Sequence, residues 1–302
     1  MPSEQAIREA NVRYHDLAAD HYDVKWGIGY GAIGQAQVES KLRKALGRPP
    51  GRYRRALEIG AGTGYFSLNL LRIGAIEEAV ATDLSPGMLS VLEESARDLD
   101  LAVETVACEA AALPFPDRSF DLVHGHAVLH HVPDLGAAFR EFRRVLRPGG
   151  VLAFCGEPSL YGDRLAALPK RAALVAAPLW RVLLRAAPRP PSSNGGSSEE
   201  ERLERVVDVH AFTPAELARP ARAAGLEQVR VRGEELVSGL FGWVNRTLEA
   251  TAEPTDVPWA WRVYAHRGYL ALQAVDRSLL EPRLPPALFY NLLLSARAPE
   301  RG

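Results

Sequence analysis

The sequence predicts an α/β fold whose centre is a doubly wound, mostly parallel sheet of seven strands. Two observations lead to this prediction. Short apolar runs alternate with helical patterns along the first half of the chain, and each run ends beside glycines, acidic residues or histidines. Parallel strands that helices cover on both faces appear as short continuous apolar runs, so this alternation favours the architecture.

Five strands are expected in the first half, over residues 56–59, 79–84, 101–108, 121–131 and 151–158. The helix after the second strand has the clearest start, because Ser85 suits its N-cap and Pro86 suits its first position. Ligands of such sheets bind beyond the carboxyl ends of the strands. Functional residues are therefore expected directly after these five segments.

The second half adds two strands and two helical insertions, which are expected to form a substrate lid. Thr213 and Glu216 form a capping box at the start of a helix, and residues 228–237 then alternate as a strand should. The expected segments are an N-terminal helical cap (1–50), the ligand-binding core (51–157), a helical insertion with a flexible loop (158–207), a continuation of the core (208–237), a second helical insertion (238–284), and the final strand with a tail (285–302).

Composition and charge exclude several classes of protein. With 47% hydrophobic and 24% charged residues, the chain has the composition of a folded protein rather than a disordered one. Its 36 basic residues are balanced by 37 acidic ones, which argues against a nucleic-acid partner. Two cysteines, and a first segment without an apolar core, favour the reducing cytoplasm.

A glycine-rich segment follows the first strand. Glu58 precedes Gly60, Gly62 and Gly64, and Asp83 ends the second strand. Glycines let the backbone approach a ligand closely, and a carboxylate accepts hydrogen bonds from both hydroxyls of a ribose. A dinucleotide oxidoreductase is disfavoured, because the G-x-G-x-x-G spacing is absent and Glu58 would repel a pyrophosphate. Glu58 instead favours a nucleoside that carries a positively charged amino acid, as S-adenosylmethionine does.

Five motifs follow one another along the core: EIGAGTGYF, ATDLSPGML, EAAALPFPDRSFD, AVLHHVPD and VLRPGGVLAF. Together they resemble the class I S-adenosylmethionine-dependent methyltransferases, in the branch of quinone-biosynthesis and other small-molecule enzymes. The resemblance extends over 53–157 and, more weakly, over 14–22 and 288–299. It implies a Rossmann-like core that binds S-adenosylmethionine and releases S-adenosylhomocysteine as the product.

The resemblance also implies roles for individual residues. Gly60 and Gly62 would pass beneath the methionine part, and Asp83 would hold the ribose. Glu109 stands where the family usually has Asp and would accept from the adenine amino group, beside the backbone N–H of Ala110. The full set implied for the cofactor is Tyr14, Tyr22, Glu58, Gly60, Ala61, Gly62, Gly64, Asp83, Leu84, Met88, Glu109, Ala110 and His126.

Apolar and aromatic residues complete the implied site. Leu84 and Met88 would flank the adenine, while Tyr14 and Tyr22 belong to an N-terminal helix that closes over the cofactor. Aromatic faces there would also favour a cation. His126 follows the fourth strand and would lie near the sulfonium.

Methyl transfer from a sulfonium requires alignment of the reacting atoms more than acid–base chemistry. A base is needed only where the acceptor carries a proton, as a hydroxyl does, and His126 and Glu157 are then the candidates. His130 and His131 are expected to have structural or capping roles. No acidic cluster indicates a metal site. The expected activity is O- or C-methylation of a small hydrophobic acceptor.

The sequence leaves two questions open: whether the protein is an enzyme, and whether residues 159–190 contact a membrane. A non-catalytic S-adenosylmethionine-binding module, which binds a protein through the helical insertions, is the alternative to an enzyme. Residues 159–190 contain six basic residues and one acidic residue among leucines. Such a stretch is typical either of a lid with solvated arginines or of a helix at the anionic inner face of a membrane.

Overall fold

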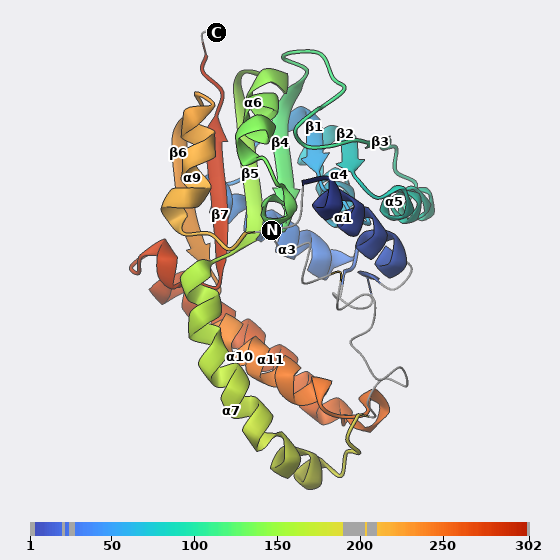
Figure 1. Cartoon of the computed structure of the whole chain (residues 1–302), viewed down its shortest axis with the longest axis vertical. Coiled ribbons are helices and arrows are strands. Elements are labelled where there is room, and N and C mark those ends of the chain that lie inside the picture. The colour runs from blue at the N-terminus through green and yellow to red at the C-terminus, as the bar shows by residue number, and fades with distance from the viewer. Residues whose placement is uncertain (1–3, 20–21, 24–27, 190–202, 204–209, 301–302) are drawn as a thin grey trace. The chain divides into compact units, whose positions relative to one another are not determined.

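The computed structural model describes residues 4–19, 22–23, 28–189, 203 and 210–300 (Figure 1). Most of the flexible loop expected within 158–207 lies outside the described residues. Contacts divide the chain into two compact units. The core unit comprises Met1–Glu157, Glu199–Val231 and Leu293–Gly302, and the helical unit comprises Pro158–Ser198 and Arg232–Leu292.

A seven-stranded sheet runs through the core unit in the order β3-β2-β1-β4-β5-β7-β6. Its strands are β1 (Tyr53–Ile59), β2 (Ile76–Asp83), β3 (Glu104–Ala107), β4 (Phe120–His126), β5 (Leu146–Pro158), β6 (Glu227–Glu234) and β7 (Asn291–Arg297). The strands β1 to β5 pair in parallel. β7 runs against β5, since the N–H of Ala298 donates to the carbonyl of Gly150 at the start of β5 (2.9 Å). The predicted seven-stranded, mostly parallel sheet is confirmed.

Helices flank this sheet (Figure 1), and two of them begin as the sequence predicts. Ser85 caps α5 by accepting from the N–H of Met88 (3.0 Å), and Thr213 and Glu216 form the capping box of α9. The helical elements of the core unit are α1 (Glu4–Ala18), α3 (Ala32–Leu46), α4 (Tyr65–Arg72), α5 (Pro86–Asp98), the 3-10 turn η2 (Leu129–His131), α6 (Leu135–Val145) and α9 (Pro214–Ala223).

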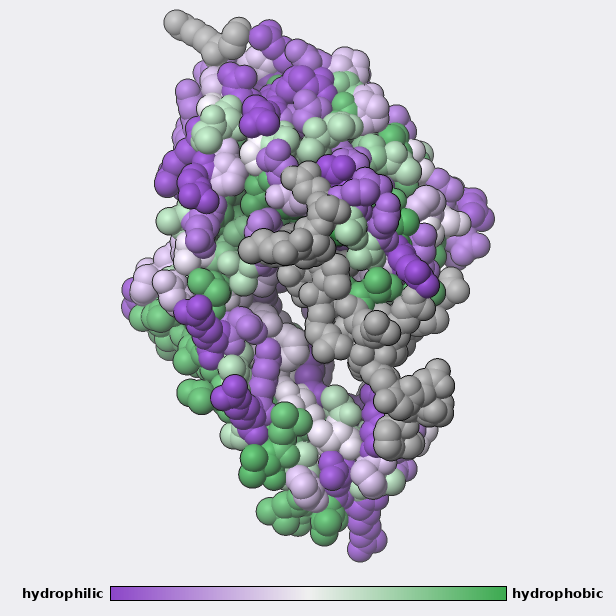
Figure 2. Space-filling view, viewed as in Figure 1, coloured by the Kyte–Doolittle hydropathy of each residue, from purple (hydrophilic) through white to green (hydrophobic). Residues whose placement is uncertain are grey.

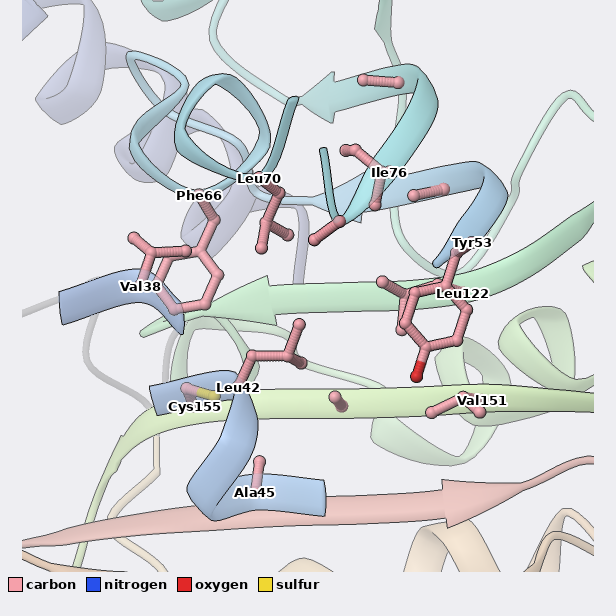
Figure 3. Packing of buried hydrophobic residues seen from close by; sticks show 14 of the residues in the cluster. Val38, Leu42, Ala45, Tyr53, Phe66, Leu70, Ile76, Leu122, Val151 and Cys155 are labelled. Carbon is pink, nitrogen blue, oxygen red and sulfur yellow. The ribbon is translucent and has the colours of Figure 1, made fainter. Parts of the chain in front are cut away.

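The apolar core joins α3 and α4 to the middle strands (Figure 3). Val38 and Leu42 of α3 lie near Phe66 of α4, with Leu122 of β4 and Val151 of β5 in the same cluster. Burial of each large side chain contributes about 1.5–3 kcal/mol to folding. The glycine-containing loop between β1 and α4 is therefore fixed at both ends by packed elements.

Three helices form most of the helical unit: α7 (Leu160–Leu184), α10 (Val237–Ala250) and α11 (Trp259–Val275). The turns η3 (Pro254–Asp256), η4 (Asp276–Leu280) and η5 (Pro286–Leu288) complete it. The sequence predicts that Pro169 and Pro178 divide the first helix, but α7 continues through both. Packing of α7 on α10 offsets the backbone hydrogen bond that each proline removes.

Aromatic rings of the second insertion pack within the helical unit itself. The ring of Trp261 lies 5.2 Å from those of Trp180 and Tyr264, and Phe241 lies 5.7 Å from Tyr264. These rings therefore stabilise the unit's own core. None of the helices described combines the length and the apolar character that crossing a bilayer requires.

Candidate functional site

The loop after β1 depends on two glycines with different surroundings. Gly60 and Gly62 have φ angles of +62° and +52°, a left-handed conformation that favours glycine. A Cβ on Gly60 would lie 2.2 Å from Cγ2 of Val128, whereas a Cβ on Gly62 would meet nothing within 4 Å. The backbone is thus packed at Gly60 and open to a ligand at Gly62.

Asp83 ends β2 and holds this loop in place. Its Oδ2 accepts a hydrogen bond from the N–H of Gly62 (2.8 Å), and its Oδ1 accepts one from the N–H of Ser85 (2.9 Å). A carboxylate offers about four acceptor positions. Roughly half of them therefore stay available for hydroxyl groups of a ligand.

A pocket, which we call the strand-end pocket, opens beyond the carboxyl ends of β1, β2 and β4. Eight residues of the predicted cofactor set line it: Tyr22, Gly60, Gly62, Asp83, Leu84, Glu109, Ala110 and His126. Six predicted site residues are not among its lining residues: Tyr14, Glu58, Ala61, Gly64, Met88 and Glu157.

Two further segments line the strand-end pocket, and sequence reasoning missed both. Arg8, Asn11 and His15 come from α1, and the segment 127–134 contributes residues after β4. The sequence pattern could have identified Arg8, Asn11 and His15, because positions three and four apart share one helix face and all three residues are polar. The second group includes His131, for which the sequence suggested only a structural role.

Glu109 forms an ion pair within this lining. Its carboxylate lies 3.2 Å from the guanidinium of Arg8, and both side chains are about one-third exposed. Burial, and then the nearby acidic groups, raise the pKa of the adjacent Cys108 thiol to about 11. Cys108 therefore remains a neutral thiol beside two carboxylates.

Glu58 is directed away from the strand-end pocket. Its carboxyl is buried, and its Oε2 accepts from the N–H of Ser67 in α4 (2.9 Å). Burial raises the pKa of Glu58 to about 8, so the protonated form predominates at pH 7. Met88, another predicted residue, is also buried and packs against Ala18 and Ala19. Both residues support the elements that line the pocket.

Glu157 anchors the turn that follows β4. It is fully buried, and its two oxygens accept from the backbone N–H groups of residues 128–130 at 3.0–3.2 Å. The Nδ1 atom of His130 lies 3.0 Å from Glu157 Oε2. The ring of His131, which lines the pocket, lies 3.9 Å from that of His130 and 5.6 Å from that of His15.

His126 lines the strand-end pocket with its ring held between neighbours. The imidazole stacks on Phe66 at 4.9 Å and meets the edge of Tyr65 at 6.0 Å. Gly156, at φ +74°, leaves room for it, because a Cβ there would lie 2.8 Å from its Nε2 atom. The ring orientation is therefore set by packing on two sides.

A second cavity, of about 430 Å³, lies near the start of β5, at the opposite edge of the parallel strands. Arginines of α6 line it, and Arg144 among them binds Glu141 through two nitrogens. It contains none of the predicted site residues. In the described part of the chain, no group of three or more His, Cys, Asp or Glu residues is arranged to hold a metal ion.

Comparison with known proteins agrees with this geometry. A family model described as a methyltransferase domain matches residues 57–154. Malonyl-acyl-carrier-protein O-methyltransferase of Halorhodospira halophila is 37% identical over 142 residues, which cover 47% of this chain and 46% of the relative. A ubiquinone/menaquinone biosynthesis C-methyltransferase of Stenotrophomonas maltophilia is 43% identical over 99 residues, or 32% and 39% of the two chains.

The solved structures extend the likeness to the fold. Phosphoethanolamine N-methyltransferase 2 of Haemonchus contortus, in complex with phosphomonomethylethanolamine and S-adenosylhomocysteine, is similar with a TM-score of 0.61 and 16% identity, over 99% of this chain and 61% of that one. The chain spans about half the length of the curated relatives it matches. Over residues 57–154, the chain therefore matches a methyltransferase domain, and the relatives that share this region are named as O- and C-methyltransferases.

Proposed function

We propose that this protein transfers a methyl group from S-adenosylmethionine to an oxygen or carbon atom of a small hydrophobic acceptor. The observation that carries the proposal is the strand-end pocket, which gathers Asp83, Glu109 and the open backbone at Gly62 from three loops. The relatives support the choice of acceptor atom, since one is named as an O-methyltransferase and another as a C-methyltransferase.

The lining residues fit a nucleoside. S-Adenosylmethionine supplies, when bound, a methyl group activated by the positive charge on sulfur. We assign Asp83 to the ribose hydroxyls, because it lines the strand-end pocket beside the open backbone at Gly62 and keeps acceptor positions available. Glu109 and the N–H of Ala110 are assigned to the adenine, and Leu84 to its face. Arg8 then shares the Glu109 carboxylate with the adenine amino group.

Alignment and exclusion of water are the main tasks of the protein. Val128, Val132 and Pro133 give the pocket apolar walls after β4, and this lining supports a hydrophobic acceptor. Correct orientation of the two reacting atoms lowers the barrier by an amount on the order of 7–11 kcal/mol. The buried anchor at Glu157 keeps this turn in one conformation.

His126 is the proposed base for an acceptor that carries a hydroxyl. The new bond joins the acceptor oxygen to the methyl carbon as the carbon–sulfur bond breaks, and His126 takes the hydroxyl proton. Its packing on Phe66 holds the ring in the lining. Glu157 is proposed as a positioning residue, because its oxygens are occupied by the turn and by His130.

Calorimetric titration with S-adenosylmethionine tests the cofactor assignment. Asp83→Ala should bind it roughly 10- to 100-fold more weakly, since hydrogen bonds to a charged group contribute about 1.5–3 kcal/mol. Asp98→Ala, at the exposed end of α5, is the matched control and should bind as wild type does. Equal affinity for Asp83→Ala, or tighter binding of NADH, would overturn the assignment.

Labelled methyl transfer tests the activity separately. Wild-type protein should pass a labelled methyl group to at least one member of a panel of apolar phenols, quinols and fatty-acyl thioesters. Binding of S-adenosylmethionine without transfer to any of them would favour the non-catalytic module. We place the enzyme in the cytoplasm, where reducing conditions suit the thiols of Cys108 and Cys155.

A further inference from the structure

The outer face of α7 is apolar and exposed. Four residues define an apolar stripe on it: Leu168, Val175, Leu179 and Val182. Val175 is 83% exposed and Val182 is 73% exposed. Intervals of seven, four and three residues place all four on one side of a helix. At 1.5 Å per residue the stripe is about 21 Å long.

Folding of the helical unit does not require this stripe. α7 packs within the unit through its opposite face, where Ala173, Ala177 and Trp180 are buried. Exposed apolar residues that occur singly need no explanation, but a continuous row on one face is typical of an interaction site. In Figure 2, viewed as Figure 1, hydrophobic side chains gather on the surface over α7.

Basic side chains accompany the stripe. Arg164 and Arg171 are exposed and lie within about half a helical turn of it on one flank, and exposed Arg185 follows the end of the helix. Within the described residues these three arginines form no ion pair. Asp163 is the one acidic residue of α7, and Lys170 lies 3.3 Å from it. The face therefore combines apolar contact with a local positive charge in a chain whose net charge is -1.

An exposed tryptophan lies at the same end of the unit as the last turns of α7. Trp259 begins α11 and is 77% exposed. Trp261, two residues later, contacts Trp180 of α7 at 5.2 Å between ring centroids. Tryptophan is the residue type that is most enriched at the boundary between hydrocarbon and water, together with tyrosine.

We propose that α7 binds the surface of a membrane that contains anionic lipids. The apolar stripe enters the boundary between head groups and acyl chains, and Arg164, Arg171 and Arg185 bind lipid phosphates. Charge complementarity favours this occupant, because an apolar face with arginines on its flank is typical of a helix that lies in the membrane plane. The contact requires no methyl transfer, so its test is independent of the proposed activity.

Flotation of the full chain with liposomes tests the proposal. Wild-type protein should float with vesicles of phosphatidylcholine and phosphatidylglycerol, and far less with phosphatidylcholine alone. Replacement of all three arginines by glutamine should weaken binding at low salt on the order of 100-fold. A control that removes the same charge from exposed arginines of the core unit, at positions Arg52, Arg118 and Arg140, should bind almost as wild type does.

The apolar part of the contact has its own matched pair of variants. Leu168→Gln with Val175→Gln should lower vesicle binding on the order of 10-fold. The control is Leu17→Gln with Ile33→Gln, two exposed residues of the core unit, which should leave it unchanged. Circular dichroism verifies that each variant is folded.

Three outcomes would overturn the proposal. The first is equal binding of the α7 variants and their controls. The second is the absence of wild-type flotation with either kind of vesicle. The third is a wild-type dimer in sedimentation that Val175→Gln converts to a monomer, because the stripe would then bind a second copy of the chain.

Discussion

Within the described residues, the core unit and the helical unit each contain a fully buried carboxylate that binds three consecutive backbone N–H groups. In the core unit, Glu157 accepts from residues 128–130. In the helical unit, Asp276 accepts from residues 236–238 at 2.9–3.1 Å. Each carboxylate therefore fixes the path of a turn by satisfying donors that would otherwise be buried without partners.

The two anchored turns differ in what they carry. The turn held by Glu157 presents His131 to the strand-end pocket, with the ring of His130 beside it. The turn held by Asp276 only starts α10. The primary role of a buried acid at the end of a strand or helix is thus to hold the backbone. Whether it affects catalysis depends on whether the segment that it holds lines the site.

Asp276→Ala should have the largest effect on stability. Its loss leaves three backbone N–H groups and the buried Ser238 hydroxyl without their acceptor, and we expect a loss of roughly 5 kcal/mol. Hydrogen exchange should show this loss in α10 and α11. Calorimetry should show S-adenosylmethionine binding unchanged in protein that remains folded. Faster exchange in β1 and β4 instead would show that the effect of losing Asp276 is not confined to the helical unit.

Glu58 is a third buried carboxyl, but among the described residues it accepts from a single backbone N–H group, that of Ser67, where Glu157 and Asp276 each accept from three. Its pKa of about 8 in the folded protein lies above the ordinary value near 4.5. The unfolded chain therefore releases the proton first, and stability should fall as pH rises from about 4.5 to about 8. Relative to Glu58→Gln, wild type should lose on the order of 4 kcal/mol over this window. Parallel stability curves in denaturant titrations would contradict the prediction.

Glu157→Ala should destabilise the protein by about 3 kcal/mol, less than Asp276→Ala does, because its side-chain partner His130 is only partly buried, whereas the Ser238 hydroxyl that binds Asp276 is buried. Glu157→Gln keeps one acceptor oxygen and should lose only about 1 kcal/mol. With a hydroxyl acceptor, Glu157→Gln should lower kcat a few-fold and retain the pH profile. Complete loss of turnover in a stable Glu157→Gln protein would show that this carboxylate acts on the substrate directly.

His124→Leu should have the smallest effect and the opposite sign. Within the residues that the structure describes, neither ring nitrogen of this buried histidine has a hydrogen-bond partner. Burial lowers the pKa of His124 to about 3, so the ring is neutral above that pH. Leucine should raise the free energy of unfolding by about 1 kcal/mol, and His124→Gln, which keeps polar atoms, should not. Destabilisation by leucine in denaturant titrations would reveal a partner for the ring.

Elements that contain their own start and end signals could be predicted from the sequence. The cap at Ser85 and the box of Thr213 and Glu216 form as expected. The edge of the sheet that holds the pocket followed from the same reasoning, because the carboxyl ends of parallel strands lie together. For this reason Gly62, Asp83 and Glu109 were expected together and do line one pocket.

Contacts between distant segments could not be predicted in this way. Arg8 reaches Glu109, and His15 reaches His131, only because α1 packs on the strand ends. The prediction that the Glu58 side chain faces the ligand is not supported, and the reason lies in the geometry of its own strand. Successive side chains of a strand point to opposite faces, so Ile59 lines the pocket while Glu58 faces α4.

The close approach of Gly60 to Val128 restricts how this gene can evolve. Any side chain gained at position 60 collides with Val128, and the left-handed backbone there penalises it by roughly a further 1–2 kcal/mol. A single mutation cannot remove both the collision with Val128 and the backbone penalty at position 60. Alanine at position 128 would remove the contact with Cγ2, but its Cβ would still lie 2.9 Å from a Cβ at position 60. Lineages that descend from this chain should therefore vary at 128 long before they vary at 60.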